Sequence, residues 1–544
     1  MNGMKKKLAL IFLPLLLGGC VSSLPGTSSV PASSMSSSER TLESSSSSEQ
    51  SVESLSSSEA TSEPSIPSES SKESSSEQSE EESSAPSSSS SESSAASSGS
   101  SSPSSDVASP VSEDFLAFFD PANHSKVSIK ASDEVLYFIS SYQDSKSSKY
   151  ADAYLPATIT ISFKGEDYVF EEAGIRMKGN TSRSSFFSDG SFTNIVHFKV
   201  SLKETFDGDE YNDERLLPFR HDWGEDSKGR KERKNRNFLG LEKFDLKYVP
   251  RNWGECVVRE VYAYRAFAEQ GLMSPYSTLV DMKLSSDRDS ISCSYQFIET
   301  IDKQFLKRRL SKSESSGDLY KCTYNGMGKA DFTRDNAVDK STYERVPYGK
   351  IGVEDTWNGY HPIYDLKTNE DLGEGADFSS MTNFIKTLWR CIYGDGTASE
   401  LENVLDVQQF LSFSAVSYLL GNPDDQRYNY NNFYLYFRPS DGKAVFIPYD
   451  WDWCLGLDYT GNVVNLYPLD QWTGDGQTPS NVYLAALYGE KLSYAKNDYM
   501  SYVNDYVDDV LSTSAFSSLA SAFGKTEEVN AVSSYMNAKR TRVG

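Results

Sequence analysis

The sequence predicts an α+β protein in which a sheet-rich part precedes a mainly helical part. Segments with alternating apolar residues, typical of strands, concentrate before residue 300, whereas helical patterns dominate from Phe384 onward. Of the 68 aromatic residues, 67 lie within residues 113–544. We therefore expect one folded region, 113–544, with a first lobe of about 113–310 and a second lobe of about 311–544.

The segment that precedes this region, residues 21–112, is rich in serine and has no Phe, Tyr or Trp. It carries fourteen acidic residues and two basic ones, Arg40 and Lys72. Such a composition buries too little apolar surface to offset the entropy lost on ordering. We expect a disordered Ser/Glu-rich linker that holds the folded region away from the membrane.

Residues 1–20 read as a targeting signal, because three lysines precede an apolar run that is shorter than a transmembrane helix. The run ends at Leu17-Gly18-Gly19-Cys20, which resembles a bacterial lipobox. That resemblance implies cleavage before Cys20 and diacylation of its thiol. An ordinary secretory signal is the alternative. Either way we expect the protein to be exported, and in the first case it is anchored to the outer face of the bacterial cell membrane through the lipid on Cys20 only.

Composition excludes several classes of function. The net charge of −25 is opposite to that of a mainly basic nucleic-acid binder, so we expect no nucleic-acid partner. The four histidines form no H-x-x-x-H pattern, and the five cysteines after Cys20 form no C-x-x-C pair. Zinc hydrolysis and histidine-based triads are therefore disfavoured, and we expect chemistry based on carboxylates.

Several elements of the first lobe can be placed from the sequence. Alternating residues 157–163 and the returning segment 168–170 predict a hairpin around a Gly-Glu-Asp turn. A second strand, 195–202, carries Lys199. A helix is expected over 253–270, with Asn252 as its cap and Gly271 at its end, and it carries Glu260 near the edge of its apolar face. Strands over 280–284 and 294–299 and a short helix over 301–310 complete this lobe.

In the second lobe, helices are expected over 384–392, 404–420 and several stretches between 482 and 523. The segment 421–453 is the most informative, because strands 433–436 and 444–448 form a predicted hairpin. The hairpin brings Asp424, Asn432 and Asp450 together, and their oxygen atoms suit a hard cation such as Mg²⁺. Asp and Asn also dominate ordinary turns, so a purely structural role stays open.

Four motifs follow one another along the chain: GIRMKGNTS at 174–182, GDLYK at 317–321, GNPDDQRYNYNNFYLY at 421–436 and FIPYDWDWCLG at 446–456. In sequence and order they resemble the motifs of the spore-coat-protein-H (CotH) kinase family. The resemblance covers about 115–523 and implies an atypical protein-kinase-like fold, with an antiparallel-sheet N-lobe and a mainly helical C-lobe. It also implies ATP and Mg²⁺ or Mn²⁺ as cofactors.

The resemblance assigns roles to individual residues. Asp424 matches the catalytic carboxylate that accepts the proton of the substrate hydroxyl, and Asp450 and Asn432 match the metal ligands. Lys199 is the expected lysine for the ATP phosphates, with Glu260 as its helix partner. The turn that contains Gly179, Asn180 and Ser182 is expected to lie over the phosphates.

Alternatives remain open for three of these assignments, and the role of Asp452 is open as well. Lys178 competes with Lys199, and Asp425 competes with Asp424. Asn429 competes with Asn432 as the metal-binding amide, because it stands at the five-residue spacing from Asp424 that kinases show. Asp452 is either a further metal residue or a capping acid.

The expected function is a metal-dependent protein serine/threonine kinase. It would transfer the γ-phosphate of ATP to itself or to an exported or cell-surface protein substrate. Two other classes are retained: a catalytically weak pseudokinase that acts as a surface adhesion module, and a carbohydrate-active hydrolase, since such enzymes use pairs of carboxyl groups.

Overall fold

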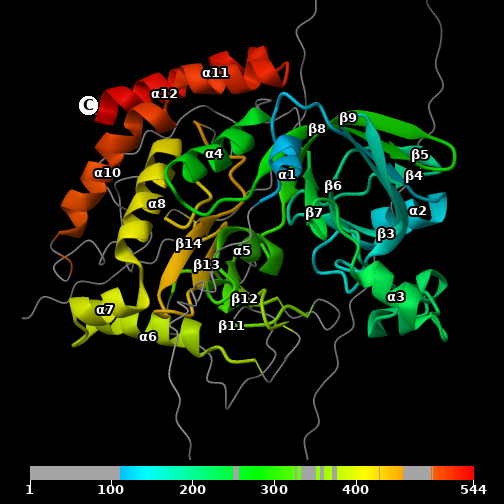
Figure 1. Ribbon diagram of the computed structural model, residues 1–544, viewed down its shortest axis with the longest axis horizontal. Helices are drawn as coiled ribbons and strands as arrows, with labels where there is room; N and C mark the ends of the chain where they lie inside the picture. The colour runs from blue at the N-terminus through cyan, green and yellow to red at the C-terminus, as the bar shows by residue number, and fades with distance from the viewer. Residues whose placement is uncertain are drawn as a thin grey trace, which may run out of the picture. The chain divides into compact units, whose positions relative to one another are not determined.

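The computed structural model describes residues 111–248, 257–324, 328–332, 351–355, 361–370, 376–427, 429–456, 492 and 494–543 (Figure 1). All of them belong to one compact unit, Gly99–Gly544. The predicted signal, Cys20 and the linker up to residue 110 lie outside the described residues. Within the described part, no helix has the length and apolar character needed to cross a membrane.

The first part of the unit is a closed barrel with the strand order β1-β2-β3-β6-β7-β9-β8. Every neighbouring pair is antiparallel except β1 and β8, which run parallel and close the barrel. The sequence predicts an antiparallel sheet and not a closed barrel. That prediction is wrong because strand β1 (Lys126–Lys130), which closes the barrel, was not predicted. The other strands are β2 (Leu155–Phe163), β3 (Glu166–Lys178), β6 (His197–Ser201), β7 (Lys243–Lys247), β8 (Ser277–Ser285) and β9 (Ser290–Glu299).

The predicted hairpin of the barrel is confirmed as β2 and β3. Every second side chain of β2 is buried, which is the pattern that its alternating sequence predicts. The turn differs from the predicted Gly-Glu-Asp: Phe163 pairs with Glu166 and Ser162 with Asp167, so the two acids belong to β3 and Lys164 and Gly165 form a two-residue turn. Both turn residues have positive φ, 52° and 82°, as a type I′ turn requires.

Helix α4 (Val258–Glu269) follows the barrel strand β7 and packs into the core of the second part. Nine of its twelve residues are buried, and Gly271, with φ 75°, follows its end as predicted. The start of the predicted helix, 253–256, and its proposed cap Asn252 lie outside the described residues.

The second part contains a five-stranded sheet with the order β11-β12-β10-β13-β14, so it is less purely helical than expected. The hairpin β13–β14 is confirmed, and the GDLYK motif supplies β10, which pairs with β13. The strands are β10 (Leu319–Cys322), β11 (Ile351–Gly352), β12 (Tyr364–Leu366), β13 (Phe433–Phe437) and β14 (Ala444–Pro448). Helix α8 (Val407–Leu420), buried along almost its whole length, lies beside this sheet (Figure 1).

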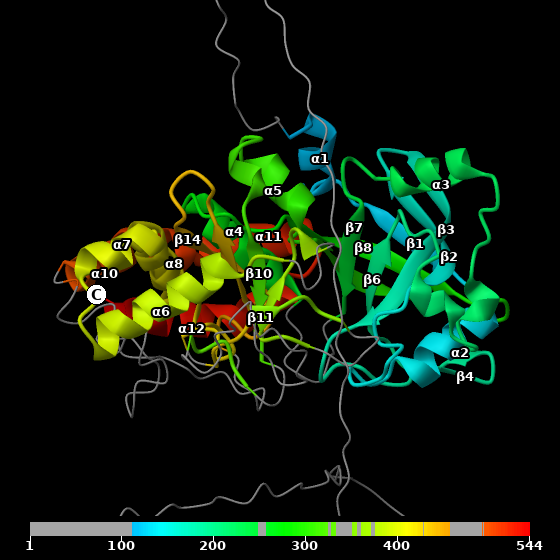
Figure 2. The same cartoon turned by 90° about the horizontal axis from the view of Figure 1, so that it is seen from below.

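The remaining elements surround these two sheets. Figure 2 shows α2 close to β4 at one end of the barrel, where the two elements are in contact. The helices are α1 (Glu113–Phe118), α2 (Asp133–Tyr142), α3 (Ser227–Lys234), α5 (Lys303–Arg309), α6 (Ser379–Tyr393), α7 (Ala398–Val404), α10 (Ala495–Val510), α11 (Thr513–Ala522) and α12 (Val529–Val543), and a small sheet pairs β4 (Phe187–Ser188) with β5 (Ser191–Phe192).

Candidate active site

A buried lysine at the end of β7 joins three acidic residues from two other elements. The Nζ atom of Lys247 lies 2.9 Å from Glu260 Oε2 on α4 and 3.2 Å from Asp452 Oδ2, and it also contacts Asp450 Oδ1. Only 8% of the Lys247 side chain and 1% of the Glu260 side chain are exposed. This cluster therefore ties the barrel to the segment that follows the β13–β14 hairpin.

Helix α4 is held firmly where it presents Glu260. The carboxylate of Glu528, in the short 3-10 helix Thr526–Glu528, accepts hydrogen bonds from the backbone N–H groups of Val257 (3.1 Å) and Val258 (3.0 Å). These donors lie at the helix start, where backbone N–H groups lack helical partners and favour a negative charge. The C-terminal helices thereby fix the position of the cluster.

The second oxygen of Glu260 organises the backbone around Asp450. Glu260 Oε1 accepts hydrogen bonds from the hydroxyl of Tyr264 (2.7 Å) and from the backbone N–H of Trp451 (3.1 Å). The same Tyr264 hydroxyl accepts a hydrogen bond from the N–H of Asp450 (3.0 Å). Asp450 has a φ of 60°, which is unfavourable for a residue other than glycine and occurs often at functional sites.

Mutual attraction keeps Lys247 and Asp450 charged although burial opposes the charge on each. Burial alone would lower the pKa of Lys247, but Asp450, Asp452 and Glu260 hold it well above its ordinary value. Burial opposes ionisation of Asp450 as well, yet Lys247 brings its pKa below the ordinary value. Burial raises the pKa of Asp452 to about 7.

Asp424 lies in the loop after α8, where side-chain amides surround its carboxylate. Asn429 donates to Oδ1 at 2.6 Å, Asn432 donates to Oδ2 at 2.9 Å, and Asn431 lies 3.3 Å from both oxygens. The amide oxygen of Asn429 accepts a hydrogen bond from Lys329 Nζ (2.8 Å). Among the described residues, the amide oxygen of Asn432 accepts no hydrogen bond.

Asn422 connects the loop of Asp424 with the Lys247 cluster. Its Oδ1 accepts a hydrogen bond from the N–H of Asp424 (2.9 Å), and its Nδ2 donates to the carbonyl of Asp450 (3.3 Å). Asp425, the alternative to Asp424, is fully buried, and its carboxylate accepts a hydrogen bond from Arg427 Nε at 2.9 Å. Asp424 is therefore the more accessible of the two carboxylates.

The expected pairing of Lys199 with Glu260 is wrong. Lys199, on β6, lies 3.7 Å from Asp245 on β7, and its competitor Lys178 lies 2.5 Å from the same carboxylate. Lys247 stands two residues after Asp245 on β7, so the two side chains share one face of the strand. The lysine that reaches Glu260 is therefore Lys247.

Burial lowers the pKa of Lys199 to about 8. Between about pH 8 and about pH 10.4, the ordinary lysine value, the unfolded chain binds a proton that the folded chain does not. This group therefore makes the protein more stable as the pH rises through that window. Replacing Lys199 by Met removes this group. We therefore expect Lys199→Met to be more stable relative to wild type at pH 7.5 than at pH 10 (roughly the two ends of the window), that is, to have the larger gain in free energy of unfolding at pH 7.5. Denaturant titrations at both pH values check this, and a constant difference would contradict it.

The predicted phosphate turn follows β3 and is partly exposed. Gly179 has a φ of 109°, and a side chain there would collide with Ser182 Oγ, so only glycine fits. Asn180 is exposed, and His197 lies beside the turn. Burial and the nearby Lys247 and Lys178 lower the pKa of His197 to about 3, so the ring is neutral and its Nδ1 accepts a hydrogen bond from Tyr248.

Two further lysines flank the ring of Tyr449, which directly precedes Asp450. Lys178, from the barrel, lies 5.3 Å from the ring centroid, and Lys321, from the GDLYK motif on β10, lies 4.8 Å from it. Burial lowers the pKa of Lys321, and the positive charge of Lys146 acts in the same direction. Cationic side chains from both sheets thus converge on the ring of Tyr449.

The lysines suit an anionic ligand, and the carboxylates suit a divalent cation bound beside it. Lys247 faces three carboxylates, which leaves an excess of negative charge that a divalent cation would offset. Within the described ranges, no group of three or more His, Cys, Asp or Glu side chains forms a ready metal site. A metal would therefore combine Asp450 with amide and water oxygens, as Mg²⁺ sites commonly do.

A protein-family model described as "CotH kinase protein" matches residues 208–535, which is more than half of the chain. The chain belongs to the CotH kinase family. Membership in a kinase family implies that the protein binds a nucleotide and uses ATP. Lys247, Glu260, Asp424 and Asp450 lie inside the matched segment. The motif at 174–182 and Lys199 precede it, although the sequence resemblance began near residue 115.

The other comparisons add little to the family assignment. No curated protein matches the chain. Among solved structures, the chain is similar to one of the Shewanella oneidensis MR-1 toxin–antitoxin complex of HipA, HipB and operator DNA. The two share 13% identity with a TM-score of 0.26, over 55% of this chain and 57% of that chain. A similarity with so low a TM-score supports no inference about the fold or the function of this chain.

Proposed function

We propose that this CotH kinase family member is an atypical, metal-dependent protein kinase that transfers the γ-phosphate of ATP to a hydroxyl group. The observation that carries the proposal is the convergence of Lys247, Glu260, Asp450 and the Asp424 loop. Phosphoryl transfer needs positioned phosphates, neutralised charge and an oriented hydroxyl, and these residues supply groups for each requirement. The two sheets that carry them would act as the lobes of a kinase-like fold.

Each residue has a distinct task in this proposal. Lys247, which Glu260 orients, holds the phosphate chain, and Lys178 and Lys321 add positive charge beside it. Mg²⁺ or Mn²⁺ would neutralise the phosphate oxygens from the side of Asp450 and Asn432. Asp424 orients the substrate hydroxyl and accepts its proton, a task for which its three amide donors fix the carboxylate in place.

The cluster is less suited to the hydrolase alternative. A glycoside hydrolase needs one carboxylic acid and one carboxylate that act on opposite sides of a sugar bond. Glu260, Asp450 and Asp452 instead share the same ammonium group, and Glu260 is almost completely buried. The arrangement therefore favours phosphate chemistry.

Asn432→Ala is expected to raise the Mg²⁺ concentration needed for half-maximal transfer by about 10-fold, because it removes one oxygen ligand and adds no charge. Asn429→Ala is the matched control: it removes a neighbouring amide that donates to the same Asp424, but whose oxygen accepts from Lys329. Metal titrations of both variants decide between the two asparagines. If Asn429→Ala shows the raised requirement while Asn432→Ala behaves like wild type, the metal amide is Asn429.

The acceptor is proposed to be a serine or threonine of the protein itself or of an exported or cell-surface partner. The Ser-rich linker, residues 21–112, is the nearest acceptor in sequence. Mass spectrometry of the protein after incubation with Mg-ATP tests this proposal. Phosphate on tyrosine alone would argue against it.

Anchoring at the membrane is proposed from the lipobox-like sequence before Cys20. Wild-type protein is expected to sediment with membranes and to incorporate labelled fatty acid, whereas Cys20→Ala is expected to lose the label and appear in the medium. Cys293→Ala controls for a general effect of removing a cysteine. Release of the wild type without any label would contradict the proposal.

A further inference from the structure

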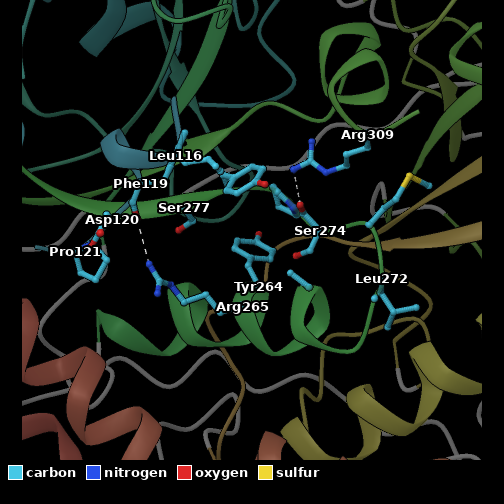
Figure 3. A pocket seen from close by; sticks show the side chains of 15 residues that line it. Leu116, Phe119, Asp120, Pro121, Tyr264, Arg265, Leu272, Ser274, Ser277 and Arg309 are labelled. Carbon is cyan, nitrogen blue, oxygen red and sulfur yellow. Dashed lines mark hydrogen bonds between the residues drawn. The ribbon is translucent and has the colours of Figure 1, made fainter. Parts of the chain in front are cut away.

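A cavity of about 720 Å³ between α1, the last turns of α4 and residues 271–277 does not reach Asp424 (Figure 3). Its lining contains no residue of the loop 421–432. Tyr264, whose hydroxyl contacts Glu260, belongs to the lining but is only 1% exposed. The features that set the geometry of Asp424 therefore lie in its own loop and in the helix before it.

Directly after Asp424, Asp425 and Arg427 form a buried ion pair. Asp425 is completely buried, and Arg427 is 7% exposed. Asp425 Oδ2 accepts a hydrogen bond from Arg427 Nε at 2.9 Å, and its Oδ1 accepts one from the Arg427 N–H, also at 2.9 Å. Taking two charges out of water can cost as much free energy as their attraction returns, so such a pair contributes little net stability. A role in fixing geometry fits the pair better than a role in stability.

The backbone of Asp425 holds two of the residues whose amides surround Asp424. Its carbonyl accepts hydrogen bonds from the N–H groups of Asn429 (3.0 Å) and Asn431 (3.4 Å). The side chains of these same two asparagines donate to the Asp424 carboxylate. Between them, Tyr430 has a positive φ of 56°, which is uncommon for a bulky residue and persists only where surrounding contacts impose it. The position of Asp425 therefore determines where the two amide donors point.

Arg427 fixes the loop to helix α8. Its Nη2 donates to the carbonyl of Ser417, in the last turn of α8, at 3.0 Å. The same carbonyl accepts a hydrogen bond from the N–H of Gly421, the left-handed residue that ends the helix. Because α8 is buried along almost its whole length, its last turn is a fixed reference for the loop. One guanidinium thus joins Asp425 to the core of the second part.

We propose that the Asp425–Arg427 pair positions the loop for phosphoryl transfer. The pair holds Asn429 and Asn431, whose amides aim the carboxylate of Asp424 at the acceptor hydroxyl. This role rests on the proposed function of Asp424 as the proton acceptor. The pair acts through Asp424 and does not itself bind the nucleotide or the acceptor.

The kinetic test compares Arg427→Met with Tyr535→Phe. Arg427→Met is expected to lower kcat by about 10- to 100-fold, because it misplaces the proton acceptor, and to leave the KM for Mg-ATP within about two-fold of wild type. Tyr535→Phe is the matched control: it removes a buried hydrogen bond of 3.0 Å to the carbonyl of Leu419, in the same turn of α8, and is expected to keep the wild-type kcat. A wild-type kcat in Arg427→Met, or an equal loss in both variants, would overturn the positioning role.

The double variant Asp425→Asn with Arg427→Met separates position from stability. Arg427→Met alone keeps the buried carboxylate and removes the guanidinium, whereas the double variant removes both charges, so its free energy of unfolding should be closer to that of wild type. Its kcat should stay as low as that of Arg427→Met, because the link to α8 is still missing. A kcat that recovers together with the stability would show that the pair is only structural and would overturn the proposal.

Hydrogen exchange at the backbone amides of Asn429 and Asn431 tests the loop contacts without nucleotide. Exchange at both amides is expected to be about ten-fold faster in Arg427→Met than in wild type or Tyr535→Phe, because their shared acceptor, the carbonyl of Asp425, loses its fixed position. Equal exchange in the three proteins would overturn the positioning role even if wild type transfers phosphate. Faster exchange in Arg427→Met with no transfer by wild type would instead contradict the kinase proposal and support the loop contacts.

Discussion

Asp424→Asn is expected to lower the rate of phosphate transfer by about 10²- to 10⁴-fold while leaving the affinity for Mg-ATP within about two-fold of wild type. The amide has nearly the shape of the carboxylate, so the loop keeps its fold, but it no longer accepts a proton. Three amide donors point at this carboxylate, and none of the charged groups of the Lys247 cluster contacts it. Transfer of γ-labelled phosphate and calorimetry with Mg-ATP measure the two quantities separately.

Asp395→Asn is the matched control for this prediction, because Asp395 is an exposed acid in the turn between α6 and α7 and contacts Arg390. Its rate should equal that of wild type. If Asp424→Asn transfers phosphate as fast as this control, Asp424 is not the proton acceptor. A wild type that binds Mg-ATP without any transfer would instead support the pseudokinase alternative.

Lys247→Met is expected to lower the free energy of unfolding by about 3–5 kcal/mol near pH 7, because it removes the only cation in contact with the almost fully buried Glu260 among the described residues. The loss should be several times that of Lys164→Met. Lys164 forms an exposed ion pair with Asp114, a type of contact that contributes about 1 kcal/mol or less. Denaturant unfolding of the two variants provides the comparison.

The double variant Lys247→Met with Glu260→Gln separates the charge effect from the loss of packing. Replacing the carboxylate by a neutral amide removes the unpaired buried charge, so part of the stability should return. Phosphate transfer should stay abolished, because the lysine that holds the phosphates is missing. Stability that does not recover in the double variant would contradict the assignment of the loss to the unpaired Glu260.

The hairpins and helices could be predicted from local sequence, because their signals are local. The alternation of β2, the β13–β14 hairpin and Gly271 after α4 all match the structure, whereas the β2–β3 turn falls at Lys164 and Gly165 and not at the predicted Gly-Glu-Asp. The closure of the barrel could not be predicted in this way. It depends on the pairing of β1 with β8, two strands about 150 residues apart in the chain.

The acids of the candidate site were found from the sequence, whereas the lysine was not. Glu260, Asp450 and Asp452 do meet, but the side chain that joins them is Lys247 rather than Lys199. A positional signal was present: Lys247 ends β7, the strand that precedes the helix of Glu260 among the described elements. The bridging roles of Asn422 and Tyr264 left no such signal, since each depends on contacts between segments distant in the chain.

The most direct test of the kinase proposal is a crystal structure of the protein with a non-hydrolysable ATP analogue and Mg²⁺. We predict that the metal ion binds oxygen atoms of Asp450 and Asn432, that Lys247 contacts the phosphate chain and that Asp424 lies beside the terminal phosphate. A nucleotide bound away from Lys247, or a metal ion held by other residues, would contradict the proposed site.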